Sequence, residues 1–349
     1  MGTDKQGAVR FATIGTSMIT GQFLEALEVV DGAELAGCYS RDAQKAADYA
    51  HAHGAEKSWS SLDDLAADPD VDAVYIASPN ACHEEQALQM IAAGKSVLVE
   101  KPFCLSQSAA ERVMEAAKER GVVAMEAMRL AHDPAYLQIR EACGQLGRIR
   151  RASFHYGKYS NRYDLVLKHE HTNIFDPKLG TGALMDLGIY PVNALVLLFG
   201  EPDDLSGFAD TIDVTGDDDL IDLCGTAVFD YPSMIADVAY SKVTTDPSPC
   251  TIEGEKATLV FSNVSSPEDV KMVAIDGTVT ELPARHRDNG TDHEVNNMEF
   301  EIRDFTGHVK ANHWPEQANH NTLVALGIMD ALRLSEGIEF PGDERDPVA

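Results

Sequence analysis

Short apolar runs alternate with amphipathic helical segments through the first part of the chain, and this alternation restricts the fold more than any other feature. The strand-like runs lie at residues 9–14, 34–39, 72–77, 96–99 and 122–125. Continuous β-branched runs indicate strands buried on both faces, as in a parallel sheet. Intervening helices of this length imply right-handed crossovers. The sequence therefore predicts a doubly wound parallel α/β domain over residues 1–130.

The pattern changes after residue 149. A strand is predicted over 149–159 and a helix over 182–199, and strand-like runs follow at 220–229, 233–241, 257–261 and 270–275. Turn signals separate these runs, which is typical of an antiparallel sheet. Helices predicted over 293–310 and 316–335 complete the chain. We expect a second domain of the α+β class over residues 131–349, packed closely against the first.

The charge balance narrows the range of partners. The chain has 57 acidic and 28 basic residues, a formal net charge of -29. Nucleic acid is not an expected partner, because phosphate neutralisation needs a basic patch, and an anionic membrane surface is not expected either. The negative field also opposes the approach of anionic substrates, which favours a neutral small molecule. Adaptation to a salty habitat is a second explanation of the acidity.

Targeting and metal-binding signals are absent from the sequence pattern. The first residues lead into a strand-like run without an apolar signal segment. The longest apolar stretch, 183–199, contains Asp186 and a proline and is short for a membrane span. The six cysteines form no CxxC pair or Cys/His cluster. We expect reduced thiols, a cytoplasmic location and no metal.

A lysine stands where the 96–99 strand ends, in the sequence Glu100-Lys101-Pro102. Pro102 has no N–H and ends the strand ladder. Open α/β sheets bind their ligands outside the carboxyl ends of the strands. A lysine at this edge, beside a carboxylate, predicts a chemical role, whereas the alternative is a solvated charge pair.

A turn between the first strand and the first helix is a candidate dinucleotide site. Of the G-x-G-x-x-G fingerprint only Gly15 is present, since Ser17 and Thr20 occupy the later glycine positions. The context of strand, tight turn and helix N-terminus nevertheless suits a pyrophosphate. An ordinary strand–helix turn is the alternative.

The end of the second strand suggests which cofactor is bound. Ser40 can donate to a ribose 2′-phosphate, Arg41 can bond to it or stack on it, and Lys45 lies one helical turn further on. NADP is therefore the preferred cofactor. NAD remains open, because Asp42 could hold a ribose hydroxyl instead.

The third signal follows the 72–77 strand. Pro79 and Asn80 are expected near the dinucleotide, and His83, in the first turn of the next helix, has a supporting role. The residues expected to hold the cofactor are Gly15, Thr16, Ser17, Met18, Ile19, Ser40, Arg41, Lys45, Ser78, Pro79, Asn80, His83, Glu100 and Lys101.

Taken in order, these motifs resemble the Gfo/Idh/MocA oxidoreductases over nearly the whole chain. The resemblance rests on the turn at Gly15, on Ser40-Arg41, on Pro79-Asn80 with His83, on Glu100-Lys101-Pro102, on the segment 180–190 and on the ending 337–341. It implies a Rossmann domain followed by an α+β domain with an open, mostly antiparallel sheet. Because it has tyrosine at position 190, the chain resembles the branch of the family that contains dihydrodiol dehydrogenases and NADP-dependent sugar dehydrogenases.

The resemblance also implies roles for three residues. Lys101 would contact the reacting oxygen, with Asp186 and Tyr190 facing it from the second domain. A helix would place Asp186 and Tyr190 on one face, because they are four residues apart. Tyr190 would exchange a proton with the substrate while a hydride moves to or from the nicotinamide, and Asp186 would orient Lys101 or bond a substrate hydroxyl. The family resemblance further implies a homodimer or homotetramer formed through the second sheet.

Substrate contacts are expected in the segment that precedes the 180–190 loop. The candidates are Tyr159, Arg162, His169, His171 and Asn173. The two histidines flank Glu170 and resemble a metal constellation, but hydrogen bonding to hydroxyls is preferred because no metal signature is present.

The expected function is transfer of a hydride between NAD(P) and a hydroxyl or carbonyl carbon of a neutral sugar, polyol or dihydrodiol. Three alternatives keep the same fold. They are a nucleotide-sensing regulator without catalysis, a glycosidase that uses tightly held NAD, and a reductase acting on imine or biliverdin-like substrates.

Overall fold

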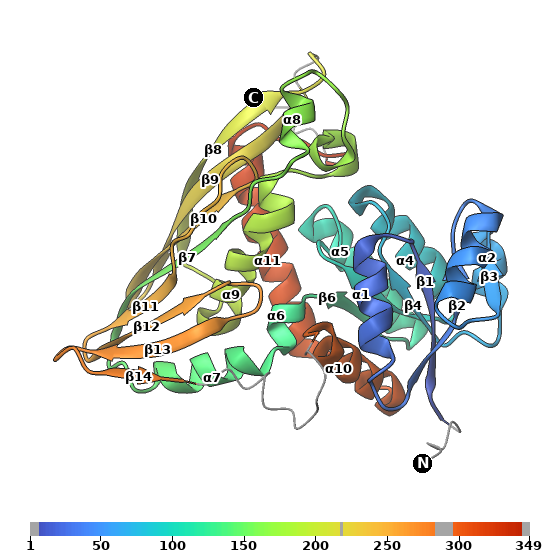
Figure 1. The fold of residues 1–349 in the computed structure, drawn as a ribbon, viewed down its shortest axis with the longest axis horizontal. Helices are drawn as coiled ribbons and strands as arrows, with labels where there is room; N and C mark the ends of the chain where they lie inside the picture. Colours follow the sequence, from blue (N-terminus) through green and yellow to red (C-terminus); the bar gives the residue numbers. More distant parts are fainter. Residues whose placement is uncertain (1–6, 217–218, 283–295, 344–349) are drawn as a thin grey trace. The chain divides into compact units, whose positions relative to one another are not determined.

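The computed structural model describes residues 7–216, 219–282 and 296–343 (Figure 1). The chain divides into two compact units, each with a sheet of its own. The first unit contains residues 1–104, 108–132 and 294–320, and the second contains 105–107, 133–293 and 321–349. A parallel α/β unit and an α+β unit confirm the expected fold class.

The first unit is built on a six-stranded parallel sheet with the order β3-β2-β1-β4-β5-β6. This order is that of a doubly wound dinucleotide-binding fold. Its strands are β1 (Val9–Ile14), β2 (Ala33–Tyr39), β3 (Lys57–Trp59), β4 (Ala73–Ile76), β5 (Ser96–Glu100) and β6 (Ala124–Ala127). Its helices are α1 (Met18–Leu27), α2 (Ala43–Ala52), α3 (Leu62–Ala67), the 3-10 turn η1 (Asn80–Cys82), α4 (His83–Ala92), α5 (Gln107–Arg120), α6 (Arg129–His132) and α10 (Met298–Ala311).

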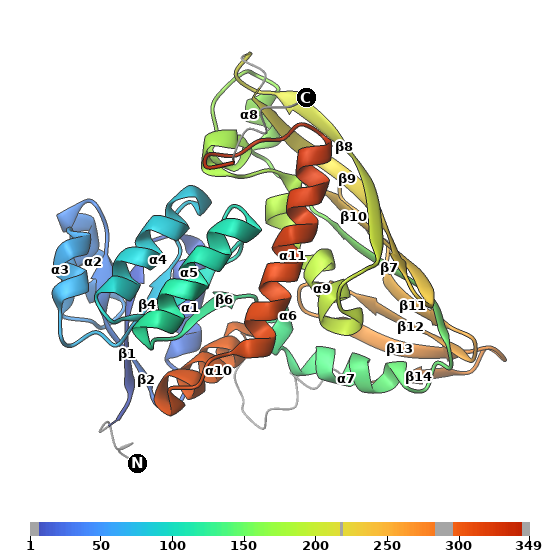
Figure 2. The same cartoon turned by 180° about the vertical axis from the view of Figure 1, so that it is seen from behind.

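Helices on both faces bury the central strands of this sheet. Every residue of β4, β5 and β6 is buried, which explains their continuous apolar runs. On one face, Phe23 of α1 stacks on Tyr75 of β4 with ring centroids 3.7 Å apart, and Phe305 of α10 lies 5.7 Å from Phe11. Figure 2 shows α4 and α5 on the other face.

Helix α10 belongs to the first unit, although it lies far beyond residue 130 in the chain. The chain leaves the first unit near residue 132, and residues 294–320 return to it. Met298, Ile302 and Phe305 lie in the same core as Phe11 and Tyr75. A helix so far along the chain could not be assigned to this core from periodicity alone, because periodicity shows that a helix has an apolar face but not what covers that face.

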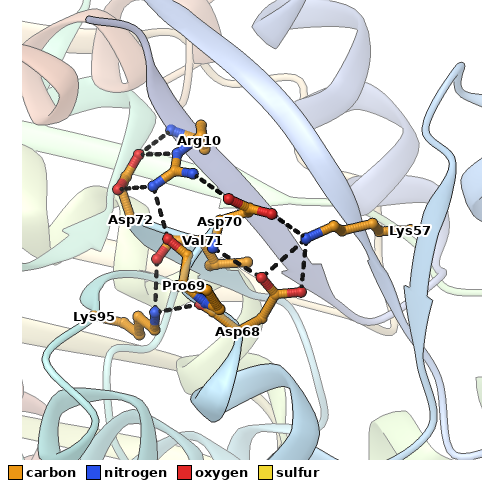
Figure 3. A network of polar contacts seen from close by, with 8 residues as sticks. All are labelled: Arg10, Lys57, Asp68, Pro69, Asp70, Val71, Asp72 and Lys95. Carbon is orange, nitrogen blue, oxygen red and sulfur yellow. Dashed lines mark hydrogen bonds and ion pairs between the residues drawn. The ribbon is translucent and has the colours of Figure 1, made fainter.

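An ion-pair network closes the amino edge of this sheet (Figure 3). Arg10 holds Asp72 through two hydrogen bonds of 2.8 Å, and Lys57 pairs with Asp68 at 3.0 Å. Lys95 donates to the carbonyl oxygens of Asp68 and Val71 at 2.6 and 2.8 Å. The network therefore joins the loop before β4 to β1, to β3 and to the residue that precedes β5, at the edge opposite the carboxyl ends.

The second unit contains an eight-stranded mixed sheet with the order β14-β13-β12-β11-β7-β10-β9-β8. Among the described strands of this second sheet, only β7 and β10 form a parallel pair. The strands are β7 (Ile149–Gly157), β8 (Asp204–Asp213), β9 (Leu220–Tyr231), β10 (Met234–Ser241), β11 (Cys250–Gly254), β12 (Ala257–Ser262), β13 (Glu268–Ala274) and β14 (Val279–Glu281). The helices and turns are α7 (Pro134–Cys143), α8 (Tyr163–Val166), η2 (Asn173–Phe175), η3 (Pro177–Leu179), η4 (Leu184–Gly188), α9 (Ile189–Phe199) and α11 (Glu316–Ser335), whose first residues belong to the other unit.

Helices cover one face of this sheet, and on the other face apolar side chains of the described strands are exposed. Helix α9 packs on β7 and β10, and both views of the ribbon place α9 and α11 on the same side (Figures 1 and 2). The strand register puts Phe208, Val228 and Ile235 on the opposite face, where they are 80%, 48% and 56% exposed. Residues 177–199 contain an 18-residue window that is apolar enough to cross a membrane, but 78% of that window is buried inside the structure. The segment is thus a core helix.

Candidate functional site

The carboxyl ends of β1, β4 and β5 lie at one edge of the first sheet, because these strands are parallel neighbours. Gly15 follows β1, Ser78 follows β4 by two residues and Lys101 follows β5. The structure therefore brings three of the predicted cofactor-binding segments to the same edge, as the general rule for open α/β sheets requires.

Gly15 is required by a close approach of two backbones. Its φ is +117°, and a Cβ at this position would lie 2.5 Å from the carbonyl oxygen of Ala77. Ser17 takes the N-cap position of α1 without a side-chain cap bond, and its Oγ lies 3.3 Å from Thr20 Oγ1. The first turn of α1 contains no acidic residue. A tight glycine turn leading into such a helix fits a pyrophosphate, although only one glycine of the fingerprint is present.

In the structure Asp42 caps helix α2, whereas an acid that binds NAD would hold the ribose 2′-hydroxyl. Its carboxylate accepts a hydrogen bond of 3.0 Å from Lys45 N and caps α2, while its own N–H donates to Ser40 Oγ at 3.3 Å. The side chains of Arg41 and Lys45 are exposed beside it. Helix capping accounts for an aspartate at this position. The neighbouring cations, Arg41 and Lys45, are the groups suited to a phosphate.

The turn that carries Lys101 is fixed from inside the unit. The buried Glu100 accepts hydrogen bonds from Tyr75 Oη at 2.5 Å and from Lys101 N at 3.2 Å, and burial raises its pKa. Glu126 accepts from Phe103 N at 3.0 Å, and the Lys101–Pro102 peptide is cis. The Glu100 carboxylate therefore works as an internal anchor for the turn, with Lys101 presented at its end.

His83 is fully buried and bridges two of the predicted cofactor segments. Its Nδ1 lies 2.8 Å from the carbonyl oxygen of Pro102, and its Nε2 lies 2.9 Å from that of Ser78. Burial lowers its pKa. His83 thus lies between the loop after β4 and the turn after β5 and contacts both.

In the second unit, Asp186 and Tyr190 lie around a break in the predicted helix 182–199. Residues Leu184–Gly188 form a π-helical turn, and α9 starts at Ile189. Pro191 has no N–H to donate to the carbonyl of Leu187, which favours such a break. The Tyr190 side chain is buried, and its ring meets that of Tyr156 edge-on with centroids 5.4 Å apart, whereas Asp186 is 45% exposed.

Two features that the sequence did not reveal hold this turn. Asp222 of β9 is buried and accepts hydrogen bonds from Ala183 N at 3.1 Å and Leu184 N at 2.6 Å, so a remote carboxylate caps the helix start. Burial raises its pKa to about 6. Gly182, with φ +128°, leaves room for it, since a Cβ there would lie 2.1 Å from Asp222 Oδ1.

The second missed residue is Lys242, directly after β10. Its Nζ lies 2.6 Å from Asp186 Oδ2. The sequence Ser241-Lys242 places a lysine at the end of a predicted strand, which is the same pattern as at Lys101. Periodicity does not reveal that a strand near residue 240 ends beside a helix start near residue 186, because this contact is purely tertiary.

The predicted substrate segment is tied to the same strand end by its backbone. Lys158 N donates to the carbonyl of Ser241 at 2.9 Å, and Ser160 N donates to that of Lys242 at 2.8 Å. The candidate side chains are exposed there: Tyr159 (39%), which donates to Asp164 at 2.5 Å, Arg162, His169, His171, which pairs with Asp176 at 2.9 Å, and Asn173. His171 therefore has a carboxylate partner of its own.

Comparison with known proteins assigns both units. Residues 9–128 match the profile described as "Oxidoreductase family, NAD-binding Rossmann fold" (GFO_IDH_MocA), and residues 136–260 match the GFO/IDH/MocA C-terminal domain. The chain is 35% identical to the scyllo-inositol 2-dehydrogenase (NADP(+)) IolU of Bacillus subtilis (strain 168), over 96% of this chain and 99% of that protein.

More distant relatives support the same assignment. The chain is 29% identical to the trans-1,2-dihydrobenzene-1,2-diol dehydrogenase of Oryctolagus cuniculus, over 70% of this chain and 72% of that protein. The crystal structure of KijD10, a 3-ketoreductase from Actinomadura kijaniata, in complex with TDP-benzene and NADP, has a TM-score of 0.77 at 24% identity, covering 93% of this chain and 97% of that one. That last likeness concerns the fold.

Proposed function

Because the chain belongs to the Gfo/Idh/MocA family of NAD(P)-dependent oxidoreductases, we propose that it interconverts a secondary alcohol and a carbonyl on a neutral polyol, sugar or dihydrodiol. The observation that carries the proposal is the meeting of Gly15, Ser78 and Lys101 at one sheet edge. Relatives named for inositol and dihydrodiol substrates support the substrate class, and so does the net charge of -29.

NADP is the proposed cofactor. The turn at Gly15 and the start of α1 would hold the pyrophosphate, and Ser40, Arg41 and Lys45 would hold the 2′-phosphate. The engagement of Asp42 as a helix cap supports this preference, since it gives the only acidic residue of the 40–45 segment a structural partner. When bound, the cofactor supplies the nicotinamide carbon that accepts or donates the hydride.

In the proposed mechanism Lys101 and Tyr190 act on one alcohol oxygen. Tyr190 removes the hydroxyl proton during oxidation and returns it during reduction. A phenol with an ordinary pKa of about 10 is a poor base at neutral pH, and a neighbouring ammonium favours the phenolate and the developing alkoxide. Lys101 supplies that ammonium, and Asp186 bonds a neighbouring hydroxyl or orients Lys101.

The face of the second sheet with exposed apolar side chains supports a homodimer or homotetramer. Its exposed side chains include Phe208, Val228 and Ile235, which the register places on one surface. Apolar groups gathered on an uncovered sheet face favour association. The protein is proposed to act in the cytoplasm.

The test is single-turnover hydride transfer followed by nicotinamide absorbance. The substrate panel contains scyllo-inositol, D-xylose, a hexose and a trans-dihydrodiol, each with NADP and with NAD. Lys101→Met and Tyr190→Phe are expected to slow the transfer step by about 10²–10⁴-fold. Lys271→Met, which removes an exposed lysine of β13, is the control and should leave the rate unchanged. Transfer at near wild-type rates in both variants contradicts the mechanism.

A further inference from the structure

The ammonium of Lys242 is buried beneath a carboxylate that solvent reaches. Its Nζ lies 2.6 Å from Asp186 Oδ2, and the exposed fractions of the two side chains are 3% and 45%. Burying a lysine is unfavourable unless the charge is paired. Lys242 is therefore the fixed member of the pair, and the position of the exposed Asp186 carboxylate depends on it.

Several contacts fix Lys242 in this place. Its N–H donates to the carbonyl of Leu223 at 3.0 Å, and its own carbonyl accepts from Ser160 N. The ammonium also lies 5.4 Å from the centre of the Phe175 ring, in a cation–π contact. The side chain thus has little freedom, and so has the carboxylate that it holds.

We propose that Lys242 is a positioning residue of the active site, which holds the Asp186 carboxylate in place and keeps it ionised to accept a hydrogen bond from a substrate hydroxyl. This rests on the proposed function, because Asp186 must face the substrate for Lys242 to act through it. The substrate class that follows carries a free hydroxyl beside the reacting carbinol, as polyols, sugars and dihydrodiols do.

Other ionisable groups surround the pair, and each bears on its pH dependence. The elements packed against η4 are β7, β9, β10 and α9. They contribute Asp222 and Cys224 from β9, Tyr240 from β10, Tyr190 from α9, and Tyr156 and His155 from β7, the last paired with Asp246 at 3.3 Å. Lys158 directly follows β7 at the same sheet end and is exposed, whereas the buried Lys242 is the cation that pairs with Asp186 and also lies near Asp222.

The experiment measures kcat/KM against pH for the wild type, Lys242→Met, Asp186→Asn and the double variant, with the polyol turned over best by the wild type. In Lys242→Met the acid limb should move to higher pH by about 1 unit or more, because the carboxylate loses the ammonium that lies 2.6 Å from it. Its kcat/KM at neutral pH should fall by about 10- to 100-fold, through misplacement of Asp186. Asp186→Asn should lose this acid limb.

The double variant separates a positioning role from a structural one. In the Asp186→Asn background, Lys242→Met should change kcat/KM by less than about 2-fold, since nothing is left to position. Melting temperatures give a second readout. Asp186→Asn should lower the melting temperature by leaving a buried charge unpaired, and adding Lys242→Met should restore it.

Each outcome bears on a different claim. An unchanged acid limb in Lys242→Met, or additive effects of the two substitutions on kcat/KM, would overturn the role of Lys242. If Lys242→Met does not fold, persistence of the acid limb in Asp186→Asn overturns it instead. Failure of the proposed function appears separately, as absence of turnover by the wild type. Lys271→Met serves again as the control.

Discussion

His83 Nδ1 lies 2.8 Å from the carbonyl oxygen of Pro102, while its Nε2 lies 2.9 Å from that of Ser78. Both neighbours only accept hydrogen bonds, and a neutral imidazole has a single N–H to donate. One buried side chain therefore joins the segments that follow β4 and β5. While the ring is neutral, only one of its nitrogens can donate a hydrogen bond, and the other nitrogen faces a carbonyl oxygen without one.

Replacing His83 by alanine should loosen both segments. The loss of a buried hydrogen bond, together with a cavity, is expected to lower the free energy of unfolding by about 2–4 kcal/mol. The KM for NADP should rise more than kcat falls, because the segments are proposed to hold the cofactor. Chemical denaturation and steady-state kinetics measure the two effects, and an unchanged KM in a folded variant would contradict the proposed cofactor role.

The same residue predicts a pH dependence of stability. Burial lowers the pKa of His83, so the unfolded chain takes up this proton at about pH 6.5 and the folded chain only at lower pH. The unfolded state binds more protons in that window, and stability must fall as the pH drops below about 6.5. In His83→Gln this contribution is absent. The difference in unfolding free energy between wild type and variant should therefore shrink between pH 7 and pH 5.5.

Arg41→Ala tests the cofactor preference. The exposed guanidinium is proposed to contact the 2′-phosphate, so its removal should raise the KM for NADP by about 10-fold, equivalent to about 1.4 kcal/mol. The KM for NAD should be unchanged, since NAD has no 2′-phosphate. Arg148→Ala, at an exposed position of the second unit, controls for the general loss of a positive charge. Equal effects on both cofactors would show that Arg41 is not the discriminating residue.

Gly182→Ala should be strongly destabilising. The new Cβ would lie 2.1 Å from Asp222 Oδ1 and would displace the carboxylate from Ala183 N and Leu184 N. Loss of these charge-assisted bonds, added to the backbone strain, is expected to cost about 3 kcal/mol or more. Gly277→Ala is the matched control, because its φ is +87° and no atom lies within 4 Å of its Cβ position. That variant should lose only about 1–2 kcal/mol, from backbone strain.

Arg10→Met should reduce stability without affecting catalysis. The Arg10–Asp72 pair is about one-third exposed, so its loss is expected to cost about 1 kcal/mol at low salt. The difference should shrink at 1 M salt, where the Debye length is about 3 Å. The pair (Figure 3) lies at the amino edge of the sheet, whereas Gly15 and Lys101 follow the carboxyl ends of β1 and β5. A change in kcat in the folded variant would contradict this separation.

The sequence alone determined five of the six strands of the first sheet, because burial on two faces leaves a continuous apolar signal in the central strands, whereas the short edge strand β3 was not predicted. It also located the turns after β1 and β5 and predicted α11 at 316–335, with the bounds that the structure confirms. Strand runs over 220–229 and 233–241 were predicted within two residues of β9 and β10. β8 and β11 were not predicted, since half-exposed strands with many polar residues carry a weaker signal.

Only the tertiary structure decided which distant side chains meet. Asp186 is 56 residues from Lys242 in the chain, and Asp222 is 38 residues from the amide of Leu184 that it caps. The assignment of α10 to the first core depended equally on a contact between segments far apart. Periodicity reports the local environment of a residue, whereas a charge pair or a remote cap depends on how strands and helices pack, which no local pattern encodes.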